Sequence, residues 1–475
     1  MNKIKYILQS TLMLIIMLVL ACTKEEGKET YKSINNLTIE TPALSSMTLS
    51  LYDSLIIAPV LKESMPEGEE YSYSWTINDS LVSLKKDLRV KVDLPIKTGY
   101  RVWFKATSKK TGIQAMYQYT LDVRGTYYAG WYVAHNKEGK ARFSFIREDD
   151  VILMNPLEEV NNKTYAGNAV GAYHALAYEY GGSTYSGYLF AFTSQGVWRF
   201  DRDNLKEIQD ISEIIPSFNN FPITSKPFQA NVPSFYIDQV LILNGGVYAG
   251  PGPAFPDYEL GSFEELSAGD YEMYPGGFFL ASNSPAYYYD NKYKRFMILP
   301  QQSSILSVAP ATPTAAFNFA NVNRTMLGFD TGNTSSREYY FIMADATNTR
   351  YLMSAIASGS GTVPGINQRI DGTDINIATN FVTSSVQKQM YYSANNKIYL
   401  YNILTNTSVL LYSFPIGNVV KDMKKSGNTR IAVATNSGTA GVVYYFDLAA
   451  TGEFTGNTYV KKYEGFGEIV KIAER

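Results

Sequence analysis

The stretch Tyr391-Tyr-Ser-Ala-Asn-Asn-Lys-Ile-Tyr-Leu-Tyr401 shows the pattern that decides the fold of most of this chain. An aromatic strand leads into a tight turn rich in Asn and Lys, and a second alternating strand follows. Alternation with a period of two places successive side chains on opposite faces of a strand, so the stretch predicts a β-hairpin. Three further stretches have the same form: 131–143, 188–200 and 287–296.

Successive hairpins lie about 40–55 residues apart, which is the period of the four-stranded blades of a β-propeller. Because a lone hairpin cannot bury both faces, neighbouring blades must cover it and the array must close. The region 125–475 therefore predicts a β-propeller of about seven blades. The strand pattern at 468–472 is well placed to finish a blade that the first strand of the array begins. The alternative is a row of further β-sandwiches.

A different strand pattern precedes the array, between residues 36 and 124. Tyr71, Tyr73 and Trp75 alternate with serines, and runs of the same kind follow towards residue 123. Turn residues separate these runs. The spacing predicts an immunoglobulin-like β-sandwich of about 90 residues, with Trp75 in a central strand as the anchor of its core.

The composition narrows both fold and function. Aromatic residues make up 14% of the chain and helical periodicity is scarce beyond residue 30, so an all-β fold is expected. The 42 basic and 44 acidic residues give a net charge of −2 without a basic stripe, which argues against nucleic acid as a partner. Cys22 is the only cysteine, which excludes an internal disulfide.

The N-terminal segment predicts export. Lys3 and Lys5 precede an apolar run that ends directly before Cys22. This order is typical of a secretory signal, and the run is short for a membrane-spanning helix, which needs about 20 apolar residues. We interpret residues 1–21 as a signal peptide and 22–35 as a flexible polar tether. A spanning helix with an incidental cysteine is the alternative.

The residues that end this segment resemble the lipobox of bacterial lipoproteins, with a small residue directly before Cys22. The resemblance implies lipidation at Cys22, and several acyl chains anchor a protein stably to a membrane. Lys24, Glu25 and Glu26 resemble the surface-export signal of Bacteroidota lipoproteins. This implies a lipid-anchored protein of the outer membrane that faces the cell exterior.

Residues 36–124 resemble the PKD-like domains of Bacteroidota surface lipoproteins, in part through Trp75-Thr-Ile-Asn-Asp79. A lipid anchor, a PKD-like domain and a propeller together resemble lipoproteins that accompany SusC/SusD-type outer-membrane uptake systems. The resemblance implies an accessory subunit that captures an oligopeptide or glycan, or presents it to a SusC-like TonB-dependent transporter and its SusD-like lipoprotein. Two alternatives stay open: a propeller-type surface glycosidase or lyase, and a structural protein that caps the transporter.

No motif assembles a catalytic or metal site, so we predict no enzymatic activity and no cofactor. His135 and His174 are expected to be structural residues of hairpins or loops, because neither belongs to a zinc motif. The triplet 330–332 has the form of an aspartic protease motif, but the chain lacks a second one, so a β-turn is expected. The stretch 371–376 could suit calcium, but its spacing is not that of an EF-hand and a polar loop is expected.

The segment 244–290 carries the candidate contact residues. It is rich in Gly, Pro and Tyr, too long for a hairpin loop and too irregular for a blade. Exposed tyrosines among Gly and Pro are typical of ligand and protein contact surfaces. An insertion that packs on its own scaffold is the alternative. The predicted contact residues are Tyr248, Tyr258, Tyr271, Tyr274 and Phe278.

Overall fold

The computed structural model shows an all-β chain, as predicted. It describes residues 34–475 except 41–43, 66–68, 176–177, 181–182, 186, 232–238, 251–260, 280–284, 302, 333–336 and 359–360. The chain divides into two compact units, one that ends at Arg124 and one that begins at Gly125. In the described part of the chain no helix is long and apolar enough to span a membrane.

The first unit is a β-sandwich. Its largest sheet has the strand order β2-β9-β8-β5-β6, in which β2 runs parallel to β9 and the other pairs are antiparallel. These strands are β2 (Ser46–Ser50), β5 (Tyr71–Ile77), β6 (Ser80–Ser83), β8 (Lys97–Ser108) and β9 (Gln114–Arg124). Two further pairs are β1 (Leu37–Ile39) with β4 (Leu61–Glu63), and β3 (Ser54–Ile57) with β7 (Leu88–Lys91).

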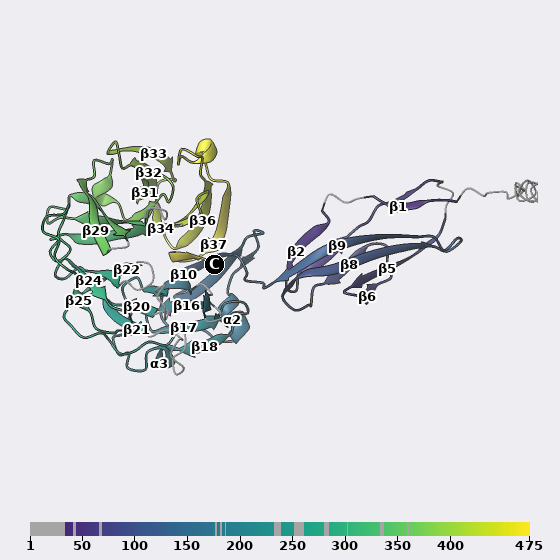
Figure 1. Cartoon of the computed structure of the whole chain (residues 1–475), viewed down its shortest axis with the longest axis horizontal. Coiled ribbons are helices and arrows are strands. Elements are labelled where there is room, and N and C mark those ends of the chain that lie inside the picture. The colour runs from purple at the N-terminus through teal and green to yellow at the C-terminus, as the bar shows by residue number, and fades with distance from the viewer. Residues whose placement is uncertain are drawn as a thin grey trace, which may run out of the picture. The chain divides into compact units, whose positions relative to one another are not determined.

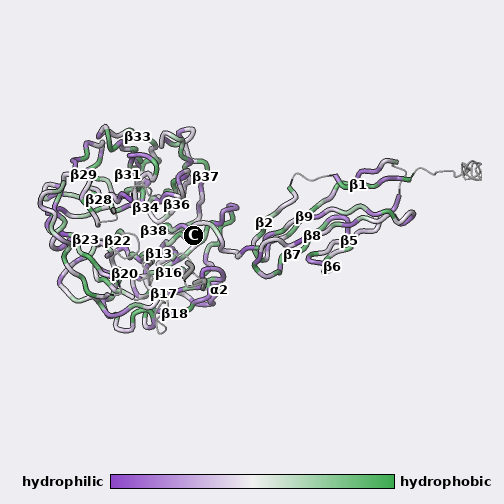
Figure 2. The backbone as a smooth tube through the Cα atoms, viewed as in Figure 1, coloured by the Kyte–Doolittle hydropathy of each residue, from purple (hydrophilic) through white to green (hydrophobic). Residues whose placement is uncertain are grey.

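Trp75 anchors the core of this sandwich, as predicted. It lies on β5 and is fully buried, with its ring centroid 4.6 Å from that of Phe104 and 5.9 Å from that of Tyr119. The indole Nε1 donates to the carbonyl oxygens of Lys85 and Lys86, each at 3.1 Å. Hydrophobic and hydrophilic residues interleave along the strands of this unit (Figure 2), which is the alternation that the sequence predicts.

The second unit is built from consecutive antiparallel sheets. In its described residues seven sheets have three or four strands each, and β14 (Tyr178–Tyr180) pairs separately with β15 (Ser183–Tyr185). The first sheet contains β10 (Gly130–Lys137), β11 (Lys140–Arg147), β12 (Ile152–Leu153) and β38 (Glu468–Glu474). The second contains β13 (Ala169–Ala175), β16 (Tyr188–Thr193), β17 (Gly196–Asp201) and β18 (Glu207–Asp210). The third contains β19 (Phe228–Asn231), β20 (Gln239–Leu243) and β21 (Gly246–Gly250).

The remaining four sheets follow in chain order. The fourth contains β22 (Met273–Phe279), β23 (Ala286–Asp290), β24 (Arg295–Leu299) and β25 (Ser307–Val308). The fifth contains β26 (Thr325–Thr331), β27 (Glu338–Ala344), β28 (Arg350–Ser358) and β29 (Gly361–Arg369). The sixth contains β30 (Asn380–Thr383), β31 (Gln389–Ala394), β32 (Lys397–Asn402) and β33 (Thr407–Ser413). The seventh contains β34 (Asn418–Ser426), β35 (Arg430–Ser437), β36 (Ala440–Asp447) and β37 (Lys461–Phe466).

The four hairpins expected from the sequence are confirmed. They correspond to the pairs β10–β11, β16–β17, β23–β24 and β31–β32. In the last of these Tyr392 lies opposite Tyr399, and the turn residue Asn395 has φ 52°. This left-handed conformation is one that Asn tolerates better than most residues, which explains why Asn occupies the turn.

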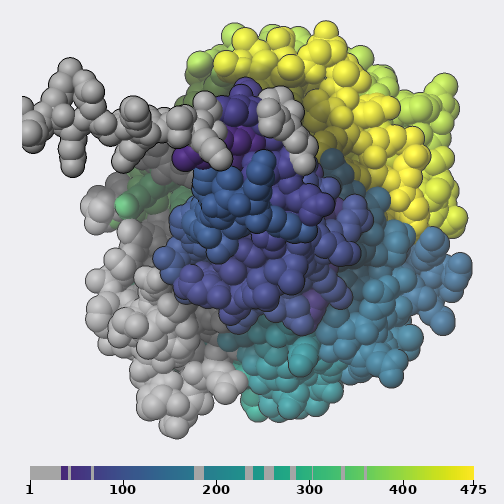
Figure 3. Space-filling view, turned by 90° about the vertical axis from the view of Figure 1, so that its right-hand side faces the viewer, coloured from purple at the N-terminus to yellow at the C-terminus, as the bar shows by residue number. Residues whose placement is uncertain are grey.

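The C-terminal strand joins the first sheet, as the sequence predicts. β38 pairs antiparallel with β10, and Asn436 of β35 exchanges two hydrogen bonds of 2.9 Å with the backbone of Ile469. In the space-filling view the yellow C-terminal surface adjoins the blue surface from the start of this unit (Figure 3). The two ends of the array therefore meet.

The sheets of this unit are arranged around a common centre (Figure 1). Hydrophobic cores lie between consecutive sheets. One such core joins the seventh sheet to the first, where the Trp131 and Tyr445 ring centroids are 6.2 Å apart. Because each sheet is covered by both neighbours, neither of its faces is left open. The arrangement is propeller-like.

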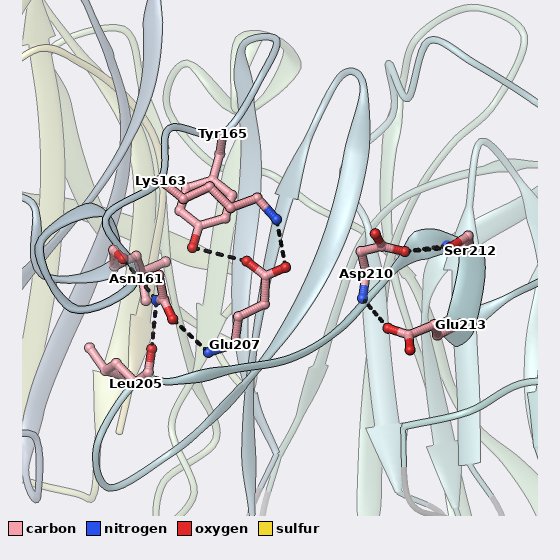
Figure 4. A network of polar contacts seen from close by, with 9 residues as sticks. Asn161, Lys163, Tyr165, Leu205, Glu207, Asp210, Ser212 and Glu213 are labelled. Carbon is pink, nitrogen blue, oxygen red and sulfur yellow. Dashed lines mark hydrogen bonds and ion pairs between the residues drawn. The ribbon is translucent and has the colours of Figure 1, made fainter.

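Short helices connect some of the sheets. They are α2 (Pro156–Asn161), α3 (Ile211–Ile214) and the 3₁₀ helix η1 (Ile375–Ile377), while the 3₁₀ helix η2 (Thr455–Asn457) lies between β36 and β37 of the seventh sheet. A polar network links α2 to the outer strand of the second sheet (Figure 4): Asn161 donates to the Leu205 carbonyl at 2.9 Å and accepts from the Glu207 amide at 2.8 Å. The Glu207 carboxylate also accepts from Lys163 at 2.6 Å and Tyr165 at 3.3 Å. The Glu207 carboxylate therefore makes its hydrogen bonds within the fold.

The expectation that 244–290 is too irregular for a blade is wrong for the two ends of the segment, whereas residues 261–272 belong to none of the named strands. Its two ends are strands of the third and fourth sheets: β21 begins at Gly246, and β22 and β23 extend to Asp290. The Gly and Pro residues obscured the strand alternation in the sequence. Two parts of the segment, 251–260 and 280–284, lie outside the described residues.

Candidate functional site

A cavity of about 440 Å³ lies where the seven sheets of the second unit meet. Each sheet contributes to it from one edge strand or from the residues just before that strand: β13, β19, β22, β26, β30, β34 and β38. Its principal lining side chains are, in chain order, Tyr173, Lys226, Phe228, Tyr274, Phe329, Phe381, Asp422, Lys424 and Lys471. The volume is in the range of small-molecule sites, about 300–1,000 Å³.

Aromatic rings form much of the cavity wall. Tyr173, Phe228, Phe329 and Phe381 are half-buried, because one side of each packs in the fold and the other faces the cavity. Gly328 allows this packing: a Cβ atom there would lie 2.7 Å from Cδ2 of Phe381. Such rings can stack against planar groups or the apolar faces of a ligand.

Lys471 is the most deeply buried cation of the cavity, with 5% of its surface exposed. Its Nζ lies 3.3 Å from the centroid of the Tyr173 ring, which is a cation–π contact. Burial, with Lys424 and Lys226 nearby, lowers the pKa of the Lys471 amine well below its usual value, and Asp422 opposes this shift. Among the described residues no carboxylate lies within 4 Å of this amine.

Asp422 is held by the backbone. Its Oδ2 accepts from the Ile472 amide at 3.0 Å and its Oδ1 from the Met423 amide at 3.1 Å, while Lys424 Nζ is 3.8 Å from Oδ1. Asn380 is fixed in a similar way, since its Nδ2 donates to the Val420 carbonyl at 3.2 Å. The bonds to Ile472 and Val420 connect neighbouring sheets and keep the polar rim of the cavity in place.

The five predicted contact residues have different environments. Tyr248 and Phe278 are buried, with 4% and 1% exposure, in cores between sheets. This corrects the expectation that they lie on a contact surface, because sheet packing covers them. Tyr271 is half-buried and donates to the Ser267 carbonyl at 2.5 Å, which favours a structural role.

Tyr274 is the predicted contact residue that reaches the cavity. Its hydroxyl donates to the Leu327 carbonyl at 3.3 Å, and burial raises the pKa of this phenol. Tyr258 lies outside the described residues, as do Cys22, Lys24, Glu25 and Glu26. Their predicted contact, lipidation and export roles stay predictions.

His135 is a structural hairpin residue, as expected. It is fully buried on β10, and its Nδ1 accepts from the Gly467 amide at 2.9 Å. The proton is therefore on Nε2, which donates to Ser144 Oγ at 2.9 Å, and this hydroxyl donates to the Met154 carbonyl at 2.5 Å. Burial lowers the pKa of His135 to about 4. Burial also lowers the pKa of His174 on β13, to about 3.

The β-turn expected at 330–332 is wrong for Asp330, which lies in strand β26. Its Oδ2 accepts from the Thr383 amide at 2.6 Å and from Thr383 Oγ1 at 3.1 Å. Burial raises the pKa of Asp330. The carboxylate bridges the fifth and sixth sheets, and this bridge accounts for an aspartate at that position.

The polar loop expected at 371–376 is confirmed for residues 371–374, and the 3₁₀ helix η1 begins at Ile375. Asp374 accepts from the Tyr399 hydroxyl at 2.5 Å, and Asp371 accepts from Asn406 Nδ2 at 3.2 Å. Within the described ranges no group of three His, Cys, Asp or Glu residues could hold a metal ion.

The comparisons with known proteins agree with a PKD-like N-terminal domain. Residues 22–169 match the model of the PKD-like family, and the match extends from the first unit across β10, β11 and β12 to Ala169, the first residue of β13. No curated protein matches the chain.

Solved structures resemble the chain at low identity. A quinonprotein alcohol dehydrogenase-like protein from Bacteroides thetaiotaomicron is 13% identical, with a TM-score of 0.47, over 91% of this chain and 96% of that one. A 6-phosphogluconolactonase-like protein from Bacteroides uniformis is 9% identical, with a TM-score of 0.47, over 73% and 99%. The activities in these names belong to those proteins.

Sequence reasoning missed most of the cavity residues. Lys226, Lys424 and Lys471 are distant in sequence and meet only because the sheets surround one centre. One signal was present: Lys471 interrupts the apolar run between Val470 and Ile472. Because lysine is rarely buried in a protein interior, a lysine within the predicted closing strand indicates an unusual environment for its side chain.

Proposed function

We propose that the protein is a surface-exposed outer-membrane lipoprotein that captures a small ligand in the central cavity, as a non-catalytic accessory subunit of a SusC/SusD-type uptake complex. In this proposal the seven sheets are the blades of a closed seven-bladed propeller. The observation that carries it is the convergence of all seven edge strands on one aromatic-walled cavity.

The chemistry of the cavity favours binding over hydrolysis. Binding sites are typically apolar clefts with a few fixed polar groups, and this cavity has aromatic walls with Asp422 and Asn380 fixed by backbone contacts. Glycoside hydrolysis normally uses two carboxylates. Asp422 is the single carboxylate among the described lining residues, and its Oδ2 is occupied by the Ile472 amide.

Anchoring and partners rest on the sequence. Cys22 would carry the lipid, and Lys24, Glu25 and Glu26 the surface address. The match to the PKD-like family supports the resemblance from which the SusC-like and SusD-like partners are proposed. The ligand in this proposal is an oligopeptide or a glycan.

The test is a rim substitution that blocks the cavity. Thr379 is exposed and lines the cavity, so Thr379→Trp adds bulk there without crowding a core. Thr407→Trp, at an exposed position on β33 outside the cavity lining, is the matched control. Native mass spectrometry with a panel of tripeptides and neutral or acidic trisaccharides should show binding to wild type and Thr407→Trp, and at least tenfold weaker binding to Thr379→Trp. Equal binding by all three proteins would contradict the proposal, and product formation by wild type would favour the enzyme alternative.

A further inference from the structure

The charge of the cavity is unbalanced. Three lysines, Lys226, Lys424 and Lys471, and one aspartate, Asp422, are the ionisable lysine and carboxylate side chains among its described lining residues. With all four groups ionised, two positive charges are in excess. The walls of the same cavity are aromatic, so the excess charge lies beside apolar surface.

The one carboxylate does not neutralise Lys471. Asp422 accepts from the Ile472 and Met423 amides, and its nearest ion-pair partner is Lys424 at 3.8 Å. Lys471 instead lies against the Tyr173 ring. A cation–π contact compensates only part of the cost of removing an ammonium group from water.

A buried cation at a cavity wall is stabilised when an anion enters. A carboxylate that binds Lys471 and Lys424 would replace the water that the Lys471 amine loses on burial, and it would raise the pKa of Lys471 towards its usual value. The same ligand needs an apolar or planar part to lie against Phe329 and Phe381, which line the cavity from β26 of the fifth sheet and β30 of the sixth.

We propose, on the basis of the ligand-capture function above, that the cavity selects ligands with a carboxylate next to an apolar or planar group, and that Lys471 and Lys424 bind the carboxylate. Two sources supply this chemistry: the C-terminus of a peptide and the carboxylate of an acidic sugar. Lys226, exposed near the cavity, would attract such anions from solution.

The experiment compares ligands that differ only in this charge. The probes are N-acetyl-Ala-Ala-Phe, its C-terminal amide, trigalacturonate and neutral galactotriose, and the measurement is isothermal titration calorimetry. Wild type should bind at least one carboxylate probe tenfold or more tighter than its neutral counterpart. The probe pair that shows this preference distinguishes peptide from acidic sugar.

Two lysine variants and one control complete the test. Lys471→Met and Lys424→Gln should each reduce the preference for the carboxylate probe to threefold or less. Lys462→Gln, on outer strand β37 where Lys462 pairs with Glu464 at 2.6 Å, should leave it unchanged. The partly exposed Lys424 keeps the test valid if Lys471→Met folds poorly.

The outcomes separate this inference from the proposed function. Equal affinity for charged and neutral probes, or a preference that survives both lysine variants, would overturn the inference. If in either case Thr379→Trp still abolishes probe binding, the proposed ligand capture in the cavity stands, but without selection for a carboxylate by the lysines. Binding that Thr379→Trp does not affect would contradict both, and no binding of any probe at millimolar concentration would overturn the inference.

Discussion

Lys471 Nζ lies 3.3 Å from the centroid of the Tyr173 ring, so the last strand of the chain places its cation against the first strand of the second sheet. This contact exists only because β38 joins the first sheet and borders β13. The closure of the array and the chemistry of the cavity therefore depend on the same strand.

Lys471→Met should stabilise the protein at pH 7 by about 1–2 kcal/mol, because it removes a buried cation without a close counter-ion. The folded-state pKa of Lys471 is lowered by burial, by Lys424 and by Lys226, against the opposing effect of Asp422. The unfolded chain therefore takes up the proton first as the pH falls below about 10.4, which destabilises wild type. The stability gain of the variant should shrink between pH 7 and pH 10 in urea unfolding. A stability gain of Lys471→Met that is constant with pH would contradict the lowered pKa of Lys471 in the folded state.

The stability of the second unit should fall as the pH drops below about 6.5, partly through His135. Its folded-state pKa of about 4 is below the unfolded value, so the unfolded state binds the proton first between these two pH values. The loss from this residue is on the order of 3 kcal/mol when complete. NMR titration of the His135 ring should give a midpoint near pH 4. A midpoint near 6.5 would show that the ring is not buried with hydrogen bonds to the Gly467 amide and Ser144 Oγ.

Trp75→Phe should destabilise the first unit by about 2–3 kcal/mol, because it leaves a cavity and removes the donor to the Lys85 and Lys86 carbonyls. The half-buried Trp103 on β8 offers a control, and Trp103→Phe should cost less than about 1 kcal/mol. Calorimetry should show a lower transition for the first unit and an unchanged one for the second. Equal effects of the two substitutions would show that Trp75 is not the anchor.

The tyrosines of 244–290 should separate into two groups. Tyr274→Ala should weaken ligand binding tenfold or more, because this side chain lines the cavity. Tyr271→Phe should leave binding unchanged and lower stability by about 1 kcal/mol through the lost bond to the Ser267 carbonyl. Calorimetric titration and thermal unfolding of both variants check this. If Tyr271→Phe weakens ligand binding and Tyr274→Ala does not, the contact surface lies outside the cavity.

Cys22→Ala should release a soluble protein, because Cys22 is the predicted lipid anchor. Glu25→Ala with Glu26→Ala should leave the protein lipidated but facing the periplasm. Protease added to whole cells should then degrade wild type and spare the double variant. Equal degradation of both would refute the surface address.

The sequence predicts strands better than it predicts the site. The hairpin at Tyr391–Tyr401, the closing strand at Glu468–Ile472 and the anchor Trp75 are visible because local alternation of side chains determines each of them. The sandwich and the propeller-like array follow from the same periodicity.

The cavity could not be predicted in the same way, since its residues come from seven sheets and only the closed ring brings them together. Asp330 looked like a turn residue because its partner, Thr383, lies in the next sheet. Tyr248 and Phe278 looked exposed because Gly and Pro surround them in sequence, whereas packing between sheets buries them. Each of these errors concerns a contact between sheets rather than within one strand.

The most direct test of the central cavity as the ligand site is a crystal structure of the protein soaked with the tightest-binding probe. Electron density for the ligand is expected within the cavity, with its carboxylate in hydrogen-bond reach of Lys471 and Lys424 and its apolar part against Phe329. Ligand density on the outer strands or on the first unit, with an empty cavity, would contradict ligand capture at this site.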